Sequence, residues 1–213
     1  MRILLMVMLL PTFFSSAVWA APAIYINIPE LILRVYDNNK LIKEYPVALG
    51  TSYERTPVGN YKITSKEKNP TWIPGTGFSD KTPVPPGADN PLGSRWMEFS
   101  PAYGIHGTNK DWDIEYPVSG GCIRMHNADV EELYELVDVG TPVTITYQTL
   151  LLKERNKSLY LTILPDIYNH KDGSKEKVAE LFKPYAQKYK LLTGWNFPDD
   201  DTTRKEFKIG AGK

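Results

Sequence analysis

The chain contains a single cysteine, Cys122, and the residues around it favour chemistry at its thiol. Gly120 and Gly121 come directly before it, and glycines let a backbone turn sharply and expose its N–H groups. Arg124 and the start of an expected helix follow it, and both stabilise a thiolate relative to a thiol. A lone cysteine is more commonly a buried, inert side chain. This local sequence instead indicates a nucleophile.

A thiolate nucleophile needs a general base, and the chain has three histidines. His170 lies in a polar stretch and is expected at the surface. His126 would share a side with Cys122 only if the backbone between them were helical, and the glycines argue against that. His106 follows an apolar strand and precedes Gly107, a position from which a side chain can project into a cleft. We therefore pair His106 with Cys122.

Two further interpretations concern the neighbours of the cysteine. If the backbone from Cys122 to Arg124 is extended, both side chains point to the same face. Arg124 then either tunes the thiolate, binds a substrate carboxylate or forms a structural ion pair under the loop, and the sequence leaves these alternatives open. A zinc site made by Cys122, His106 and His126 is disfavoured, because the chain has no Cys-x-x-Cys or His-x-x-x-His pair. We expect no metal.

The elements that would position these residues are mostly strands. Apolar alternation and turn residues recur through the first two thirds of the chain. One helix follows the cysteine; Asn127 is expected to cap it and Gly140 to end it. Residues 69–94 are rich in Pro and Gly, contain Trp72 and predict a long surface loop. The expected strands are 23–28, 31–36, 41–49, 61–65, 96–99, one around Ile105, and 141–147.

These patterns predict a mainly β, sandwich-like domain over residues 21–147, with one helix after the catalytic Cys. Residues 148–213 are interpreted as a small α/β C-terminal extension that packs on this core and is not an independent domain. The expected elements of the extension are a strand at 159–163, an amphipathic helix at about 175–190 that Pro184 should kink or split, and a loose tail after Trp195.

Residues 1–20 are typical of a secretory signal peptide. Arg2 precedes an apolar run at 3–10, and small residues lead up to Ala20, after which we expect cleavage. The run is too short to span a bilayer, so we expect no stable membrane insertion after cleavage; an uncleaved anchor is the alternative. Lys+Arg and Asp+Glu both number 25, so no net charge selects nucleic acid as a partner.

Two segments, 104–109 and 119–127, together resemble the signature of the YkuD-type L,D-transpeptidase catalytic domain. The shared pattern is a His-Gly segment, a spacer, and then Ser-x-Gly-Cys-x-Arg before a polar helix start. Residues 56–61, 69–72 and 140–143 are also similar to family motifs, and the resemblance covers about 125 of the 213 residues. The chain departs from the family at Gly120, where the family commonly has a second His. This departure puts substrate orientation in doubt.

The resemblance implies an acyl transfer on peptidoglycan. The cysteine would attack the carbonyl of the third residue of a stem tetrapeptide, D-alanine would leave, and an amine of a neighbouring stem would resolve the thioester into a 3→3 cross-link. The site residues so implied are Cys122 and His106 for catalysis, Gly121, Gly107 and Ser119 for the oxyanion and for orientation, and Arg124, Asn127 and Trp72 for substrate binding, with no metal and no cofactor.

The implied partners are peptidoglycan stem peptides, with a tetrapeptide as donor and an amine as acceptor. The place of action would be the periplasm or cell wall, and the protein is expected to be a monomer. Two alternatives remain open. One is a hydrolase on the same scaffold, acting as a carboxypeptidase or an amidase; the other is a catalytically silent wall-binding module.

Overall fold

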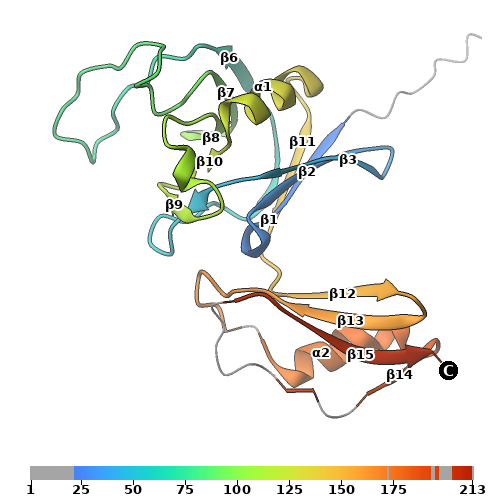
Figure 1. The fold of residues 1–213 in the computed structure, drawn as a ribbon. Helices are drawn as coiled ribbons and strands as arrows, with labels where there is room; N and C mark the ends of the chain where they lie inside the picture. The colour runs from blue at the N-terminus through green and yellow to red at the C-terminus, as the bar shows by residue number, and fades with distance from the viewer. Residues whose placement is uncertain (1–21, 172, 193–194, 197–202, 213) are drawn as a thin grey trace, which may run out of the picture.

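The computed structural model describes residues 22–171, 173–192, 195–196 and 203–212. They form two β-rich units, an N-terminal unit and a C-terminal unit, joined by a linker that passes through Tyr147 and Gln148 (Figure 1). The expected signal peptide, residues 1–20, lies outside the described residues.

Strands dominate the N-terminal unit, as its alternating sequence predicts. They are β1 (Ala23–Asn27), β2 (Ile32–Asp37), β3 (Lys40–Pro46), β4 (Leu49–Gly50), β5 (Gly59–Lys62), β6 (Ser65–Lys68), β7 (Arg95–Ser100), β8 (Tyr103–His106), β9 (Pro117–Ser119), β10 (Ile123–Arg124) and β11 (Pro142–Thr146). A five-stranded sheet has the order β3-β2-β1-β11-β5, and a four-stranded sheet has the order β10-β8-β7-β6. Strands β4 and β9 pair in parallel, and short 3-10 helices occupy Ile28–Glu30 and Asp111–Asp113.

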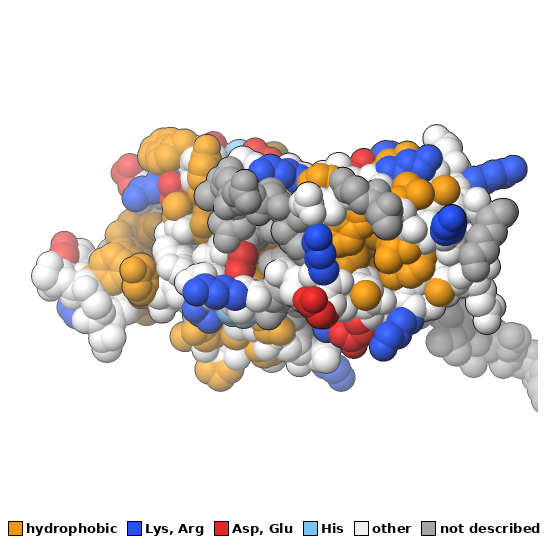
Figure 2. All heavy atoms as spheres, turned by 90° about the horizontal axis from the view of Figure 1, so that it is seen from below, with side chains coloured by type: hydrophobic (Ala, Val, Ile, Leu, Met, Phe, Trp, Pro, Cys, Tyr) orange, Lys and Arg blue, Asp and Glu red, His pale blue; other side chains and the backbone are white. Residues whose placement is uncertain are grey.

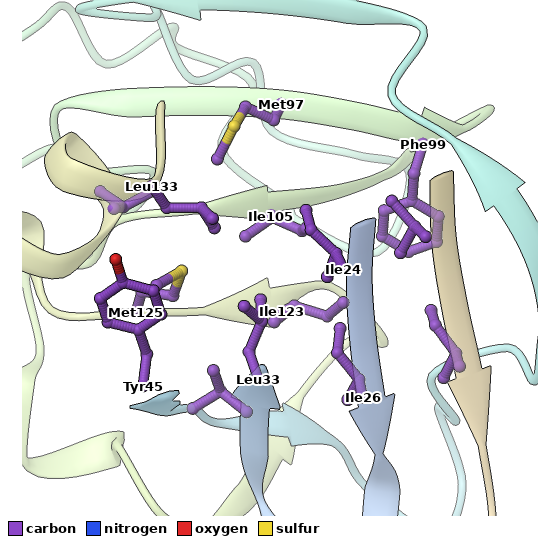
Figure 3. Packing of buried hydrophobic residues seen from close by; sticks show 14 of the residues in the cluster. Ile24, Ile26, Leu33, Tyr45, Met97, Phe99, Ile105, Ile123, Met125 and Leu133 are labelled. Carbon is purple, nitrogen blue, oxygen red and sulfur yellow. The ribbon is translucent and has the colours of Figure 1, made fainter. Parts of the chain in front are cut away.

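The two sheets enclose one apolar core, which confirms the mainly β, sandwich-like prediction. Ile24 and Ile26 alternate along β1 and are buried, as the period of two along a strand requires. They pack towards side chains of the second sheet, such as Ile105 and Met97, and towards Leu133 of helix α1 (Asn127–Leu136), as Figure 3 shows. Strand β8, which carries His106, and strand β10, which directly follows Cys122, are therefore packed against this core.

Helix α1 differs at both ends from the prediction. Its N-cap residue is His126, which makes no side-chain capping bond, so Asn127 begins the helix and does not cap it. The helix ends at Leu136, because Val137 is already extended, and not at Gly140. Gly140 has a φ of +95° and serves the turn before β11.

The C-terminal unit contains more structure than the sequence predicted. Its sheet has the order β12-β13-β15-β14, with β12 at Leu150–Arg155, β13 at Ser158–Ile163, β14 at Tyr189–Leu191 and β15 at Lys205–Gly212. The prediction of a loose tail is wrong for β15, which pairs with both β13 and β14. Helix α2 (Lys175–Phe182) is shorter than predicted and passes into a 3-10 turn (Lys183–Tyr185) at Pro184, as expected for a helix-breaking residue.

The C-terminal unit has a hydrophobic cluster of its own, which includes Leu161, Val178, Tyr189 and Ile209. Figure 2 looks onto this unit from below and shows hydrophobic side chains interspersed with Lys and Arg. Within the described ranges, no helix is long and apolar enough to cross a bilayer. One side chain of this part of the chain, Tyr168, is instead buried in the core cluster of the N-terminal unit.

Candidate active site

Strand pairing brings the regions of Cys122 and His106 together. Strands β10 and β8 are parallel neighbours, with Ile123 opposite Ile105 and Arg124 opposite His106. Side chains alternate along a strand, so the two isoleucines point into the core while His106 and Arg124 share the other face. The same alternation places Cys122 on the side of Arg124. The strand pairing therefore brings the backbone next to Cys122 beside the strand that carries His106.

A glycine and a tryptophan shape the surface beside these residues. A Cβ on Gly104 would lie 2.5 Å from the Trp96 ring, so only glycine leaves room for that ring. Trp96 lies opposite His106 in the β7–β8 register, and their rings stack with centroids 5.6 Å apart. Our sequence reasoning did not single out Trp96. Its alternation with Met97 and Phe99, which are both buried in the core, was the available signal.

His106 is held as a neutral, oriented imidazole. Its side chain is only 4% exposed, and its Nδ1–H donates to the carbonyl of Gly107 at 2.6 Å. Burial lowers the pKa of His106 to about 4; the hydrogen bond to the Gly107 backbone opposes the shift, the positive charge of Arg124 adds to it, and a hydrogen bond to the Leu92 backbone opposes it more weakly. At neutral pH the ring therefore carries one proton, on Nδ1, and Nε2 is left as the basic atom. Gly107 occupies the orienting position expected for it.

The thiol of Cys122 is less acidic than its sequence context suggested. Desolvation raises the pKa of Cys122, and it outweighs the opposing effects of the Gly104 N–H and the charge of Arg124. The Sγ atom lies 3.6 Å from the carbonyl of Ala102, a distance that suits a weak S–H donor. The resting pair is thus a thiol with a neutral imidazole, and not a thiolate with an imidazolium.

Ser119 organises the tight turn that precedes the cysteine. Its buried hydroxyl donates to the carbonyl of Cys122 at 2.6 Å and accepts the N–H of Gly121 at 3.1 Å. Gly121 has a φ of +103°, and a Cβ there would lie 2.7 Å from the Tyr103 ring, so glycine is required. Gly120 is different, because a Cβ there meets only Glu54, at 3.7 Å. A larger residue fits at Gly120, and the backbone does not impose the departure from the family pattern.

Arg124 forms the structural ion pair that was one of its open alternatives. Its Nη1 lies 2.5 Å from Oδ2 of Asp113, and both side chains are largely shielded from solvent. Asp113 belongs to the 3-10 turn at Asp111–Asp113, which the sequence did not connect with the site. Arg124 still acts electrostatically on the site, because its charge lowers the pKa of both Cys122 and His106.

Asn127 ties together the loops beside His106. Its Oδ1 accepts the backbone N–H of Ser94 at 3.0 Å, and its Nδ2 donates to the carbonyl of Thr108 at 2.8 Å. A Cβ on Gly93 or Gly107 would lie 2.1 or 2.2 Å from that Oδ1, so both glycines allow the close approach. The amide expected to bind substrate is therefore engaged in holding the protein backbone.

Trp72 lies within the 69–94 loop, in a bridge to Val84. Its ring makes an edge-to-face contact with Phe78, with centroids 5.0 Å apart. Among the described residues, no hydrogen bond or ring contact joins Trp72 to Cys122 or His106. The structure thus does not bring Trp72 together with the catalytic candidates.

His170 is exposed, as predicted, and His126 is partly exposed. Nδ1 of His126 lies 2.9 Å from Oδ1 of Asp111. The ring of His170 contacts Tyr147, with centroids 4.2 Å apart. Within the part of the chain that the structure describes, no group of three His, Cys, Asp or Glu side chains is placed to hold a metal ion.

A β-sandwich that sets one oriented imidazole on a strand, and one thiol directly before the neighbouring strand, has the layout of a cysteine-dependent acyl-transfer enzyme. Residues 21–145 match the YkuD family model, described as the L,D-transpeptidase catalytic domain. The chain belongs to this family, and its N-terminal unit is an L,D-transpeptidase catalytic domain. The match ends near the linker, so the C-terminal unit lies outside it.

Relatives and solved structures agree with this family. The putative L,D-transpeptidase YqjB of Bacillus subtilis (strain 168) is 39% identical over 132 residues, which cover 59% of this chain and 71% of the relative. The putative L,D-transpeptidase YkuD of Bacillus licheniformis is 40% identical over 115 residues, or 54% of this chain and 59% of that protein. The structure of LD transpeptidase LdtMt1 in complex with imipenem shares the fold, with a TM-score of 0.51, 19% identity and 59% of each chain covered.

Proposed function

We propose that this chain is an exported peptidoglycan L,D-transpeptidase that forms 3→3 cross-links through a thioester on Cys122, with release of D-alanine. One observation carries the proposal: Cys122 directly precedes β10, the strand that pairs with the His106 strand β8, and the Gly107 carbonyl accepts the Nδ1–H of His106, which leaves Nε2 basic. Family membership supports the reaction class. Export rests on the sequence pattern of residues 1–20.

The first half of the reaction uses the resting thiol and the neutral imidazole. As Sγ of Cys122 attacks the donor carbonyl, its proton passes to Nε2 of His106, and a C–S bond forms. The Gly107 carbonyl stabilises the imidazolium by accepting a hydrogen bond from its Nδ1–H. When the tetrahedral intermediate collapses, the C–N bond to D-alanine breaks and His106 returns the proton to the departing amine. The product is a thioester on Cys122 with the imidazole neutral again.

The oxyanion needs backbone donors, and the turn before the cysteine determines which N–H groups can serve. Gly121 already donates to Ser119, so its N–H would have to leave that bond to serve the oxyanion. We therefore assign the main donor role to the N–H of Cys122, whose backbone Ser119 holds from the other side through the carbonyl.

The second half of the reaction resolves the thioester and regenerates the free enzyme. An amine of a neighbouring stem attacks the thioester, Nε2 of His106 takes the proton of that amine, and the C–S bond breaks as an amide forms. The thiolate of Cys122 then recovers the proton from His106. If water replaced the amine, the same site would act as a hydrolase. The acceptor therefore decides between the proposal and its closest alternative.

Carbapenem acylation tests the proposal, since the solved relative LdtMt1 is described in complex with imipenem. We expect residues 21–213 to gain one imipenem mass by intact-protein mass spectrometry, whereas Cys122→Ala gains none. Incubation with a tetrapeptide donor should then yield a cross-linked dimer and D-alanine. Tripeptide without dimer would establish the hydrolase instead. A folded wild-type protein with no adduct would favour the silent wall-binding module.

The pH dependence of Cys122 alkylation follows from the two pKa shifts. The raised pKa of Cys122 and the pKa of His106 at about 4 leave a thiol and a neutral ring throughout the range from pH 5 to pH 8. We expect the iodoacetamide rate to keep rising with pH beyond the ordinary thiol value of about 8.5. A flat rate between pH 5 and pH 8 would show a thiolate–imidazolium pair and contradict this electrostatic account.

A further inference from the structure

The C-terminal part of the chain reaches into the N-terminal unit through Tyr168. This side chain is 2% exposed and packs with the core cluster of the two sheets. Its ring stacks on Tyr147, with centroids 5.2 Å apart, and its backbone N–H donates to the Tyr147 hydroxyl at 2.8 Å. That hydroxyl in turn donates to Asp166 at 2.5 Å. Tyr168 is therefore firmly placed by residues on its own side.

The phenolic hydroxyl of Tyr168 bridges the two ends of a loop at residues 51–56, which we call the 51–56 loop. It donates to the carbonyl of Gly50 at 3.0 Å and accepts the N–H of Thr56 at 3.0 Å. The hydroxyl of Thr56 also accepts a hydrogen bond from the N–H of Gly50 at 2.9 Å, which joins the same two ends of the loop. One buried hydroxyl thus holds both ends of the loop, and its removal would leave a buried carbonyl and N–H unpaired.

Arg55 supplies a second attachment between the 51–56 loop and the same segment. One guanidinium nitrogen donates to the carbonyl of Tyr168 at 3.0 Å, and another lies 3.1 Å from Nε2 of His170. The guanidinium carbon also lies 5.2 Å from the centre of the Tyr168 ring, within cation–π range. The segment around Tyr168 therefore binds this loop both at its two ends and through the side chain of Arg55.

The 51–56 loop in turn touches the turn that carries the cysteine. The N–H of Thr51 donates to the carbonyl of Ser119 at 3.1 Å. The carbonyl of Arg55 would lie only 3.0 Å from a Cβ on Gly121, so the loop backbone lies directly against that glycine. Ser119 is the residue that fixes the carbonyl of Cys122. Contacts thus run without a gap from Tyr168 to the cysteine backbone.

We propose that Tyr168 is a positioning residue for the reaction at Cys122: it anchors the 51–56 loop, which holds the Ser119–Gly121 backbone in the form that presents the thiol and its N–H. The proposal rests on the proposed function, because it assumes acylation of Cys122. It extends the active site into residues 164–171, beyond the part of the chain that matches the family model. Its effect should be on the acylation step, since no substrate contact is assigned to Tyr168.

Tyr168→Phe tests the proposal, with Tyr189→Phe as the matched control. Both tyrosines are 2% exposed, and Tyr189 also donates a hydrogen bond, to Glu154 at 2.9 Å, but it does so inside the C-terminal unit. Imipenem acylation would be measured over a concentration series, which separates apparent binding from the first-order acylation constant. We expect Tyr168→Phe to lower the acylation constant about tenfold with little change in binding, because small misplacements of reacting groups cost rate steeply.

A readout without substrate separates this proposal from the proposed function. Amide hydrogen exchange at residues 50–56 and 119–122 should be faster in Tyr168→Phe than in Tyr189→Phe. Equal acylation and exchange in Tyr168→Phe and wild type, or equal acylation losses in both variants, would overturn the proposal. Should Tyr168→Phe fail to fold, Arg55→Met is measured in its place with the same expected direction. A wild-type protein that forms no adduct would overturn the proposed function, and exchange would still decide the role of Tyr168.

Discussion

Replacing His106 with Gln is expected to lower the rate of thioester formation by about 10²- to 10⁴-fold, the usual contribution of a positioned general acid–base group. The reason lies in the resting state: Cys122 is a thiol, so it needs a proton acceptor during the attack, and D-alanine needs a proton to leave. Glutamine fills much of the same space beside Trp96 but cannot exchange that proton. The rates of imipenem acylation of His106→Gln and of the wild-type protein, both measured at pH 7, test this prediction.

His126→Gln is the matched control for His106→Gln, because the partly exposed ring of His126 pairs with the exposed carboxylate of Asp111. Its acylation rate should stay close to wild type. At high pH, where hydroxide deprotonates Cys122 without help, alkylation of His106→Gln should approach the wild-type rate. A His106→Gln protein that is folded by thermal melting yet acylates normally would refute the role given to His106.

Sequence reasoning reaches those features of the candidate site that depend on residues close together in the sequence. Gly121 before Cys122 and Gly107 directly after His106 lie where a Cβ would come too close to its neighbours, so glycine at these two positions already indicates tight local backbone packing. The β-sandwich was equally predictable, because a period of two along successive strands, such as that of Ile24 and Ile26, marks the buried face. Local patterns of this kind predict local structure with little dependence on the rest of the fold.

The missed features depend on partners distant in the sequence. Arg124 had three open roles, and only the position of Asp113 decides for the ion pair. Burial of Cys122 reversed the direction of its expected pKa shift, because local sequence shows the helix start and the arginine but not the desolvation. Asn127 was assigned to capping and to substrate, whereas its partners Ser94 and Thr108 lie on loops that meet only in the fold.

The C-terminal unit shows a different cause of error. The alternation of Phe207 and Ile209 with Glu206 and Lys208 is typical of a strand, whereas the sequence analysis expected a loose tail after Trp195. Pairing with strands on both sides overrides that weak local preference. Tyr168 could not be found at all from sequence, because its importance comes from two backbone groups more than a hundred residues away.

Asn127→Ala is expected to lower the acylation rate about 10²-fold, because it frees the backbone that orients His106, and a displacement of about 1 Å in a site has this order of effect. It removes two hydrogen bonds and leaves the N–H of Ser94 and the carbonyl of Thr108 unpaired, which should destabilise the fold by about 2–4 kcal/mol. Thermal melting and imipenem acylation on the same sample measure both effects.

The control for Asn127→Ala is Asn109→Ala. Asn109 lines the same polar hollow of the surface, but its amide makes a single exposed bond, to the carbonyl of Asp89 at 2.9 Å. Its loss should change the acylation rate and the melting temperature only slightly. If Asn127→Ala were destabilised but acylated at the wild-type rate, the amide would support only the fold. If its rate fell while donor binding weakened in proportion, Asn127 would instead contact substrate, as the family resemblance implied.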